Sequence, residues 1–226
     1  MTNAGAGETT EVLQRGFPPI LGGAPRLLIL GSMPGVASLR CGQYYGHPRN
    51  AFWPILCDLL GLPATADYAR RTAALMDHGI ALWDVIAACE RPGSLDTAIR
   101  PATVQVNDFN ALFAACPGIA RIGCNGATAA REYRRRVLPG LTPAARAIPC
   151  LQLPSTSPAH AGMDYRSKRA AWAVLFEGLD ASPNALVQSQ VSDQHRWLAN
   201  ADQPEVGVHR VQQIVGFDGD HRAGDG

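Results

Sequence analysis

The sequence is short of several features that would place it in familiar protein classes. It contains no run of about 18 or more apolar residues, which excludes a membrane-spanning helix of ordinary length. None of the six cysteines forms a C-x-x-C pair. The sequence therefore predicts neither an iron–sulfur cluster nor another metal site, and we expect reduced, mostly buried thiols. Lys168 is the only lysine, so nearly all of the positive charge comes from arginine.

The N-terminus also lacks the pattern of a secretory signal. Its first residues, MTNAGAGETTEVLQRG, are polar and acidic where a signal peptide is basic and then apolar, so we expect a cytoplasmic protein. We expect residues 1–18 to be a disordered leader, and residues 182–226, rich in Gln, Asp, Ser and Gly, to be an acidic, disordered tail. Residues 19–181 remain as one domain of ordinary size.

The net charge of +1 hides an asymmetry along the chain. Residues 20–179 contain 16 Lys and Arg against 10 Asp and Glu, a net charge of +6, whereas residues 180–226 contain 3 against 7, a net charge of −4. A basic globular body is typical of proteins that bind polyanions. Arginines at positions 131, 134, 135 and 136 add to this charge, although such a run is more often a solvated helix face.

Short apolar runs alternate with segments of helical periodicity in this body. The sequence predicts strands over residues 26–31, 119–124 and 147–153, and helices over residues 49–60, 68–78, 107–116, 127–137 and 165–179. Residues 80–89 are apolar and fit either a strand or a helix. Strands separated by helices indicate parallel β-α units, and therefore an α/β fold built as a three-layer sandwich.

The most informative segment, residues 31–53, has the sequence GSMPGVASLRCGQYYGHPRNAFW and follows the apolar run RLLIL. A buried strand that ends in a Gly/Pro loop places groups at the carboxyl edge of a sheet, where α/β proteins bind ligands. The loop carries aromatic rings, hydrogen-bonding groups and a cation, but few aliphatic side chains. This set suits a planar polar ring joined to a phosphate, which describes a nucleotide.

A second motif, LPSTSPAHAG, follows the last predicted strand. Small hydroxyls and backbone amides in front of a helix can cradle a phosphate. Taken alone, STSPA is also compatible with an ordinary Ser/Pro turn that leads into a helix.

Together, GSMPG…QYYGHPRNAFW and LPSTSPAHAG resemble the uracil-DNA glycosylase superfamily, and within it the hypoxanthine-DNA (deoxyinosine) glycosylase branch, over about residues 25–179. The resemblance implies a three-layer α/β/α sandwich with a central, mainly parallel four-stranded sheet. It also implies a monofunctional DNA glycosylase that hydrolyses the N-glycosidic bond of deaminated bases, chiefly hypoxanthine, in base excision repair. The expected partner is DNA that contains a deaminated base. No cofactor, metal or membrane is expected, and the expected state is a monomer.

The motifs contain no lysine, so a Schiff-base lyase step is not expected and the product should be an intact abasic site.

The resemblance assigns base binding to Ser32, Met33 and Tyr45. Tyr45 would be the stacking platform, although Tyr44 and Tyr45 could simply pack the loop onto the next helix. Met33 stands where many relatives carry an Asn or Asp that handles the water, and a thioether cannot polarise water. The deoxyinosine branch shares this loss, which favours hypoxanthine over uracil.

The same resemblance gives catalytic roles to Asn50, His47 and Asn125. Asn50 would position the water or the sugar, although Asn is also a favoured helix N-cap. Asn125 ends a predicted strand and would hydrogen-bond the base, although Asn-Gly is also a strong turn signal. His47 could donate to the leaving base or cap the helix.

Contacts with the DNA backbone are expected from the second motif and from the cation of the first. The predicted residues are Arg49, Ser155, Thr156, Ser157, Pro158 and His160. His160 stands where this branch often has Asn. Residues 90–96, ERPGSLD, resemble a loop of the same branch to which the sequence assigns no chemistry.

Other functions remain open at this point. A uracil- or mismatch-specific DNA glycosylase would share the motifs, and a noncatalytic nucleic-acid-binding domain of the same fold would be consistent with Met33. A small-molecule hydrolase with Ser32 as nucleophile is disfavoured, because GSMPG lacks the G-x-S-x-G pattern of a nucleophile elbow.

Overall fold

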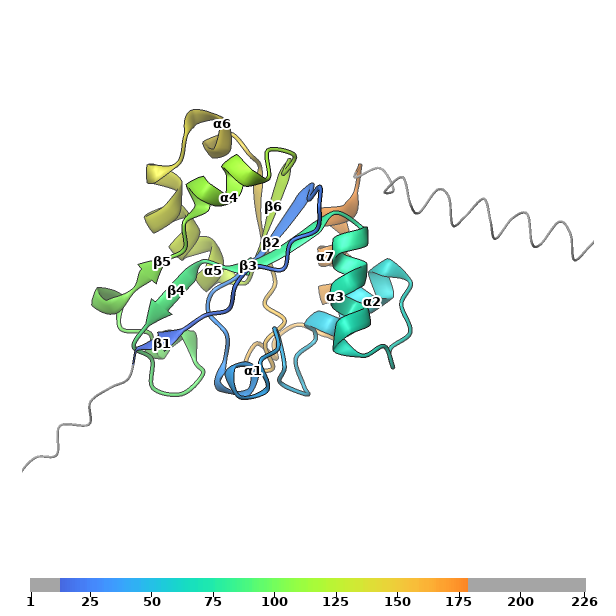
Figure 1. Ribbon diagram of the computed structural model, residues 1–226. Helices are drawn as coiled ribbons and strands as arrows, with labels where there is room; N and C mark the ends of the chain where they lie inside the picture. Colours follow the sequence, from blue (N-terminus) through green and yellow to red (C-terminus); the bar gives the residue numbers. More distant parts are fainter. Residues whose placement is uncertain (1–12, 179–226) are drawn as a thin grey trace, which may run out of the picture. The chain divides into compact units, whose positions relative to one another are not determined.

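The computed structural model describes residues 13–178, and at its centre lies a four-stranded, all-parallel sheet (Figure 1). In sheet order the strands are β3 (Ile80–Asp84), β2 (Leu27–Gly31), β6 (Arg121–Asn125) and β7 (Cys150–Leu153). All residues of β2 and β3 are buried, as their continuous apolar sequences predict. The expected α/β fold with a parallel four-stranded sheet is confirmed. The predicted acidic tail lies outside the described residues.

Alternating strand side chains build one apolar core on each face of the sheet. Leu28 and Leu30 join the core on one face, and Leu27 and Ile29 join the core on the other. The first face is covered by α4 (Phe109–Ala115), α5 (Ala127–Glu132) and α6 (Pro143–Arg146), and the second by α2 (Phe52–Leu60), α3 (Tyr68–Asp77) and α7 (Tyr165–Ala173). Figure 1 shows the two groups of helices on opposite sides of the sheet, which gives the predicted three layers.

A small antiparallel sheet flanks the central one. Its order is β1 (Gln14–Arg15), β4 (Ile86–Cys89) and β5 (Gln105–Val106). The ambiguous residues 80–89 are thus two strands, β3 and β4, separated by Val85. β1 pairs with β4, and the ring of Phe17 packs edge-on against Tyr44 with centroids 5.2 Å apart. The expected leader of residues 1–18 is therefore too long, because strand pairing and packing bring residues 14–17 into the domain.

Several elements differ from the predicted ones at their ends. The helix predicted over residues 127–137 is α-helical to Glu132 and continues as a π-helix, η3 (Tyr133–Val137). The remaining short elements are α1 (Val36–Cys41) and the 3₁₀ turns η1 (Asp96–Ala98), η2 (Pro101–Thr103), η4 (Leu138–Gly140) and η5 (Val174–Phe176). Gly61 ends α2 with a φ of 67°, as a left-handed C-cap glycine does. None of the helices in residues 13–178 is long and apolar enough to cross a membrane.

Candidate active site

The two sequence motifs meet at the carboxyl edge of the central sheet. The Ala51 N–H, in the first motif, donates to the carbonyl of Thr156, in the second, at 3.0 Å. Asn125, the last residue of β6, accepts the Thr156 N–H at 2.9 Å through Oδ1 and donates to the Thr156 hydroxyl at 2.8 Å through Nδ2. Thr156 is only 1% exposed. Its side chain therefore holds the loop in place rather than facing solvent. The Asn125 amide also acts on Tyr45, because burial raises the pKa of the phenol and a side-chain hydrogen bond with Asn125 opposes this larger effect.

Tyr45 lies flat against an aromatic ring of α2. Its ring stacks on Phe52 with centroids 3.8 Å apart and planes 20° apart. Its φ of 54° is unusual for a residue other than glycine, so the surrounding loop must hold this conformation. Tyr44 points elsewhere, because its hydroxyl donates to the carbonyl of Pro18 at 3.1 Å and the side chain is buried. Of the two tyrosines, only Tyr45 is half-buried and keeps part of its surface accessible.

The HPRN segment ties its own side chains to the backbone. Asn50 Oδ1 accepts the N–H of Phe52, the first residue of α2, at 3.0 Å, although the N-cap position itself is Ala51. This bond can stabilise the start of the helix. Its Nδ2 group remains a donor. His47 Nδ1 accepts the N–H of Arg49 at 3.1 Å, which places the proton of the neutral ring on Nε2 and makes that atom a donor. The Arg49 side chain is exposed, as a phosphate contact requires.

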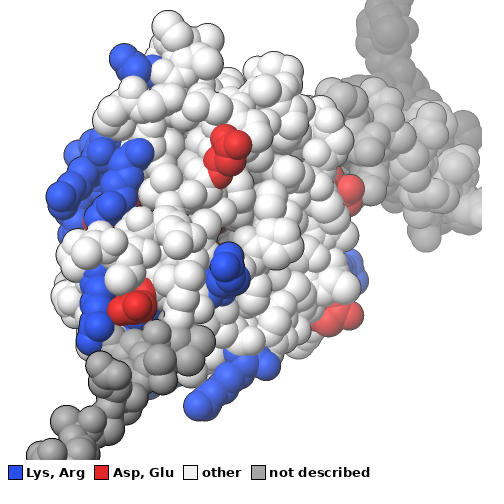
Figure 2. All heavy atoms as spheres, turned by 60° about the vertical axis from the view of Figure 1, so that its left-hand side comes forward, with Lys and Arg blue, Asp and Glu red and all other residues white. Residues whose placement is uncertain are grey.

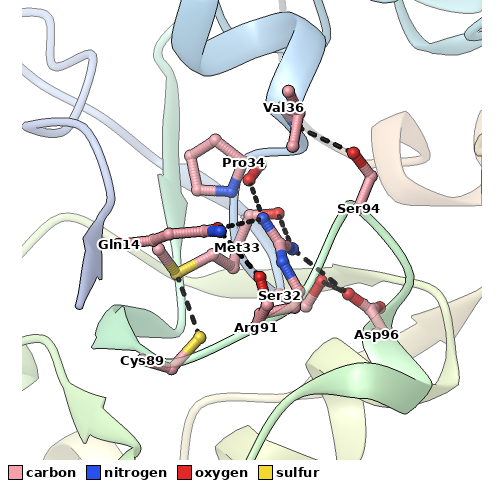
Figure 3. A network of polar contacts seen from close by, with 9 residues as sticks. All are labelled: Gln14, Ser32, Met33, Pro34, Val36, Cys89, Arg91, Ser94 and Asp96. Carbon is pink, nitrogen blue, oxygen red and sulfur yellow. Dashed lines mark hydrogen bonds and ion pairs between the residues drawn. The ribbon is translucent and has the colours of Figure 1, made fainter. Parts of the chain in front are cut away.

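The GSMPG loop is held from behind by a buried arginine (Figure 3). Arg91, whose side chain is 0% exposed, donates to the carbonyl of Met33 at 3.5 Å and to that of Pro34. The Met33 thioether points toward the small sheet and lies 3.7 Å from Cys89 Sγ, so it does not extend toward solvent. Ser32 donates its hydroxyl proton to Asp96, with both carboxylate oxygens at 2.9 Å.

Asp84 is a further candidate for the site, and the sequence did not reveal it. It ends β3, is 3% exposed, and its Oδ2 atom has no hydrogen-bond partner. Burial, and then the negative charge of Asp96, raise the pKa of Asp84 to about 7 against the opposing effect of Arg91. A Cβ on Gly31 would overlap Asp84 Oδ1 and lie 3.0 Å from the Tyr45 hydroxyl. The glycine of GSMPG thus lets a carboxyl group and a phenol approach the end of β2.

A polar residue at the end of an apolar run was the available signal for Asp84. The signal could not be used, because residues 80–89 fit either a strand or a helix. The position of Asp84 relative to the sheet edge therefore could not be predicted.

The second loop presents a row of polar groups at its surface. The Ser157 N–H donates to Ser155 Oγ at 3.2 Å, and Pro158 lies half-buried beside them. His160 is exposed, and its carbonyl accepts a bond of 2.7 Å from Lys168 Nζ. Lys168, the only lysine of the chain, is 6% exposed and serves to hold this loop.

Comparisons with known proteins agree with this architecture. The sequence profile of the Uracil DNA glycosylase superfamily matches residues 18–176. The chain is 40% identical over 114 residues to the hypoxanthine DNA glycosylase of Methanosarcina barkeri (strain Fusaro / DSM 804), covering 50% of this chain and 71% of that protein. It is 36% identical over 145 residues to the hypoxanthine DNA glycosylase of Methanosarcina acetivorans, covering 60% and 90%.

A solved structure of a related protein has a similar fold. The solution NMR structure of a proposed uracil DNA glycosylase from Methanosarcina acetivorans superposes with a TM-score of 0.63 at 33% sequence identity, covering 75% of this chain and 99% of that one. The fold, the two meeting loops and the profile match over residues 18–176 therefore lead to one assignment. The chain belongs to the uracil DNA glycosylase superfamily.

Proposed function

We propose that this protein is a monofunctional DNA glycosylase that releases deaminated bases, chiefly hypoxanthine, and leaves an intact abasic site. The observation that carries the proposal is the buried carboxyl group of Asp84, which lies with the Tyr45 hydroxyl against Gly31, at the edge where both motif loops meet. The names of the two relatives, hypoxanthine DNA glycosylase, support the choice of substrate.

Tyr45 serves as the stacking platform for a base that has left the duplex. Phe52 backs one face of the ring at 3.8 Å, so the ring cannot tilt away when a base presses on its other face. A flipped purine gains stacking energy there that offsets part of the cost of leaving the helix.

Asp84 recognises what deaminated bases have in common. Deamination converts an exocyclic amine into a carbonyl next to a ring N–H, as in O6 and N1–H of hypoxanthine. A carboxyl group that keeps its proton near neutral pH can donate to that carbonyl and accept from that N–H. As the glycosidic bond breaks, the ring gains negative charge, and the proton of Asp84 stabilises it where the charge develops.

Further donors surround this pair. His47 Nε2 and Asn50 Nδ2 can donate to the departing base, the sugar or a flanking phosphate, and the Asn125 amide holds Thr156 and Tyr45 beside them. All the residues of the proposed site belong to one chain, so we propose that a monomer is sufficient. Met33 is buried in an apolar cluster, and its thioether has no oxygen with which to align a water for uracil chemistry.

Positive charge on the surface supports DNA as the substrate. Figure 2 shows several groups of Lys and Arg side chains on one face, with few acidic side chains among them. A shallow hollow lined by Arg131, Arg134 and Arg135 lies over the start of α5, which follows directly after Asn125. Phosphate contacts of this kind give sequence-independent affinity that weakens as salt is added.

A panel of duplexes tests the proposal. Each carries one inosine, uracil, xanthosine or undamaged base, and the reaction products are split at abasic sites with hot alkali. We expect cleavage at inosine, weaker or no cleavage at uracil opposite adenine, and strand breaks only after alkali treatment. Binding without cleavage at any of the bases would identify a noncatalytic domain. Preferred cleavage at uracil would identify a uracil-type enzyme. Breaks before alkali treatment would refute the monofunctional mechanism.

A further inference from the structure

Residues 90–96, to which the sequence assigned no chemistry, wrap around the GSMPG loop. Besides its bonds to the loop carbonyls, Arg91 donates to Gln14 Oε1 at 3.2 Å. Ser94 Oγ accepts the N–H of Val36 at 2.9 Å, where α1 begins. Figure 3 shows Asp96 reaching Ser32 from the same segment. The segment therefore supplies both a buried cation and a carboxylate to the loop that follows β2.

Hydrolysis of a glycosidic bond needs a group that takes a proton from the attacking water. The obvious candidates at this edge are already engaged or unsuitable. Met33 has no oxygen in its side chain, Asn50 Oδ1 accepts from Phe52, and His47 Nδ1 accepts from Arg49.

The Ser32 hydroxyl differs from these groups. Its proton is directed at Asp96, so its lone pairs remain free and the oxygen must act as an acceptor toward anything else. The Asp96 side chain is 35% exposed, so water can reach the pair.

The groups around Asp96 locate the pair within the site. Arg91 Nη1 lies 3.9 Å from Asp96 Oδ1 on one side. On the other side, the negative charge of Asp96 acts on both Asp84 and Tyr45, raising the pKa of each. Asp96 and Asp84 thus share one site but differ in exposure and in partners. Two carboxyl groups in such unequal surroundings are suited to opposite roles in proton transfer.

We propose that Ser32 and Asp96 act together as the proton acceptor for the attacking water, a role that rests on the proposed glycosylase function. Water donates one hydrogen bond to Ser32 Oγ and attacks C1′ of the sugar. The new O–C1′ bond forms as the C1′–N9 bond breaks, and the electron pair of that bond goes to the base. The water proton passes to Ser32 Oγ while the Ser32 proton passes to Asp96, which becomes a neutral carboxylic acid. Arg91 holds the loop carbonyls and stabilises the carboxylate before transfer.

Substitutions in the full chain test this assignment. Asn at position 96 keeps an oxygen that can accept the Ser32 hydroxyl proton in a hydrogen bond, but it cannot be protonated. In single-turnover excision from an inosine duplex, Asp96→Asn and Ser32→Ala should each slow the reaction by about 100-fold or more. The double variant should be little slower than either, since the two groups act as one unit. DNA affinity by fluorescence anisotropy and the unfolding midpoint should change little in Asp96→Asn.

Glu90→Gln is the matched control, because Glu90 is an acidic residue of the same segment that pairs with Arg100 at the surface. It should excise at the wild-type rate. An Asp96→Asn or Ser32→Ala variant within threefold of the wild type would overturn this proposal and leave the proposed function standing. A wild-type protein that is inactive on the whole panel would overturn both.

Azide separates proton transfer from loop positioning. Azide is an anionic nucleophile that needs no base, so it should restore base release by Asp96→Ala and leave an azide bonded to C1′, detectable by mass spectrometry. The N–C1′ bond then forms as C1′–N9 breaks, and no proton is transferred. If Asp96 only positions the loop, azide will not accelerate the variant and no azido sugar will form.

Discussion

The buried Asp84 makes the stability of this protein depend on pH in a way that Asp84→Asn should remove. Asp84 is 3% exposed, and its pKa rises from 3.8 to about 7, first through burial and then through the charge of Asp96. A difference of about 3 pKa units corresponds to about 4 kcal/mol between the two protonation states. Because the folded-state pKa lies above the unfolded one, the charged form opposes folding. The penalty is absent below about pH 4, grows as the pH rises, and is complete above about pH 7.

The free energy of unfolding should follow this window. Between about pH 4 and pH 8, the wild type should lose up to about 4 kcal/mol relative to Asp84→Asn, whose amide has nearly the same size and no charge. Urea unfolding of both proteins across this range measures the gap. Asp77→Asn, at an exposed position of α3, is the control, and its gap should stay nearly constant. A gap for Asp84→Asn that is flat, or that favours the wild type as the pH rises, would refute the reasoning.

The same titration should appear in the chemistry. If the proton of Asp84 stabilises the departing base, the wild-type single-turnover rate on inosine should fall as the pH rises above about 7. Asp84→Asn should be slower near neutral pH and should lack this falling limb. A variant with an unchanged rate and profile would remove Asp84 from the reacting groups.

Three further substitutions test the rest of the site. Gly31→Ala should abolish excision and destabilise the fold by about 1–3 kcal/mol, because the new Cβ would overlap Asp84. Thermal unfolding by circular dichroism measures the stability, and the inosine assay measures the activity. A fully active Gly31→Ala would show that the loop can accommodate the methyl group. Asn50→Ala should slow single-turnover excision by about 100-fold, near 2.7 kcal/mol in the barrier. If Asn50 only caps α2 through Phe52, the loss should instead be about 1 kcal/mol of stability with chemistry intact. Met33→Leu should lower the free energy of unfolding by less than about 1.5 kcal/mol and retain the wild-type excision rate, since the thioether only fills an apolar cluster. Urea unfolding and the inosine assay measure the two. A large loss of activity would place Met33 in contact with the base.

Much of the architecture could be predicted because its signals are local. Short apolar runs indicated β2, β6 and β7, and helical spacing indicated α2, α3, α4, α5 and α7, whereas the short α6 was not predicted. The helix predicted over residues 49–60 does end at residue 60, because Gly61 readily adopts the left-handed conformation that terminates it. The two motifs also marked the correct edge of the sheet, because the carboxyl ends of parallel strands must lie together.

Other features depend on partners far away in the chain. β1 exists because it pairs with β4, and its two residues carry no strand signal of their own. Asp84 belongs to the site because Gly31, more than fifty residues earlier, leaves it space at the end of the neighbouring strand. Hydrogen bonds between distant residues also give some predicted site residues contacts other than the expected ones. Thr156 faces inward and Asn125 holds it there, although Thr156 was expected to contact the DNA backbone and Asn125 the base.

Local signals were sufficient to predict the fold class, the family and the two motif loops of the proposed site, because periodicity, turn chemistry and motif order depend on neighbouring residues. Which atoms remain free to act depends on contacts between segments that are distant in the chain. Whether a hydroxyl is a donor or an acceptor, or whether a carboxyl keeps its proton, depends on what lies beside it in space. Ser32 and Asp96 are 64 positions apart in the chain, and their contact of 2.9 Å defines the role of each.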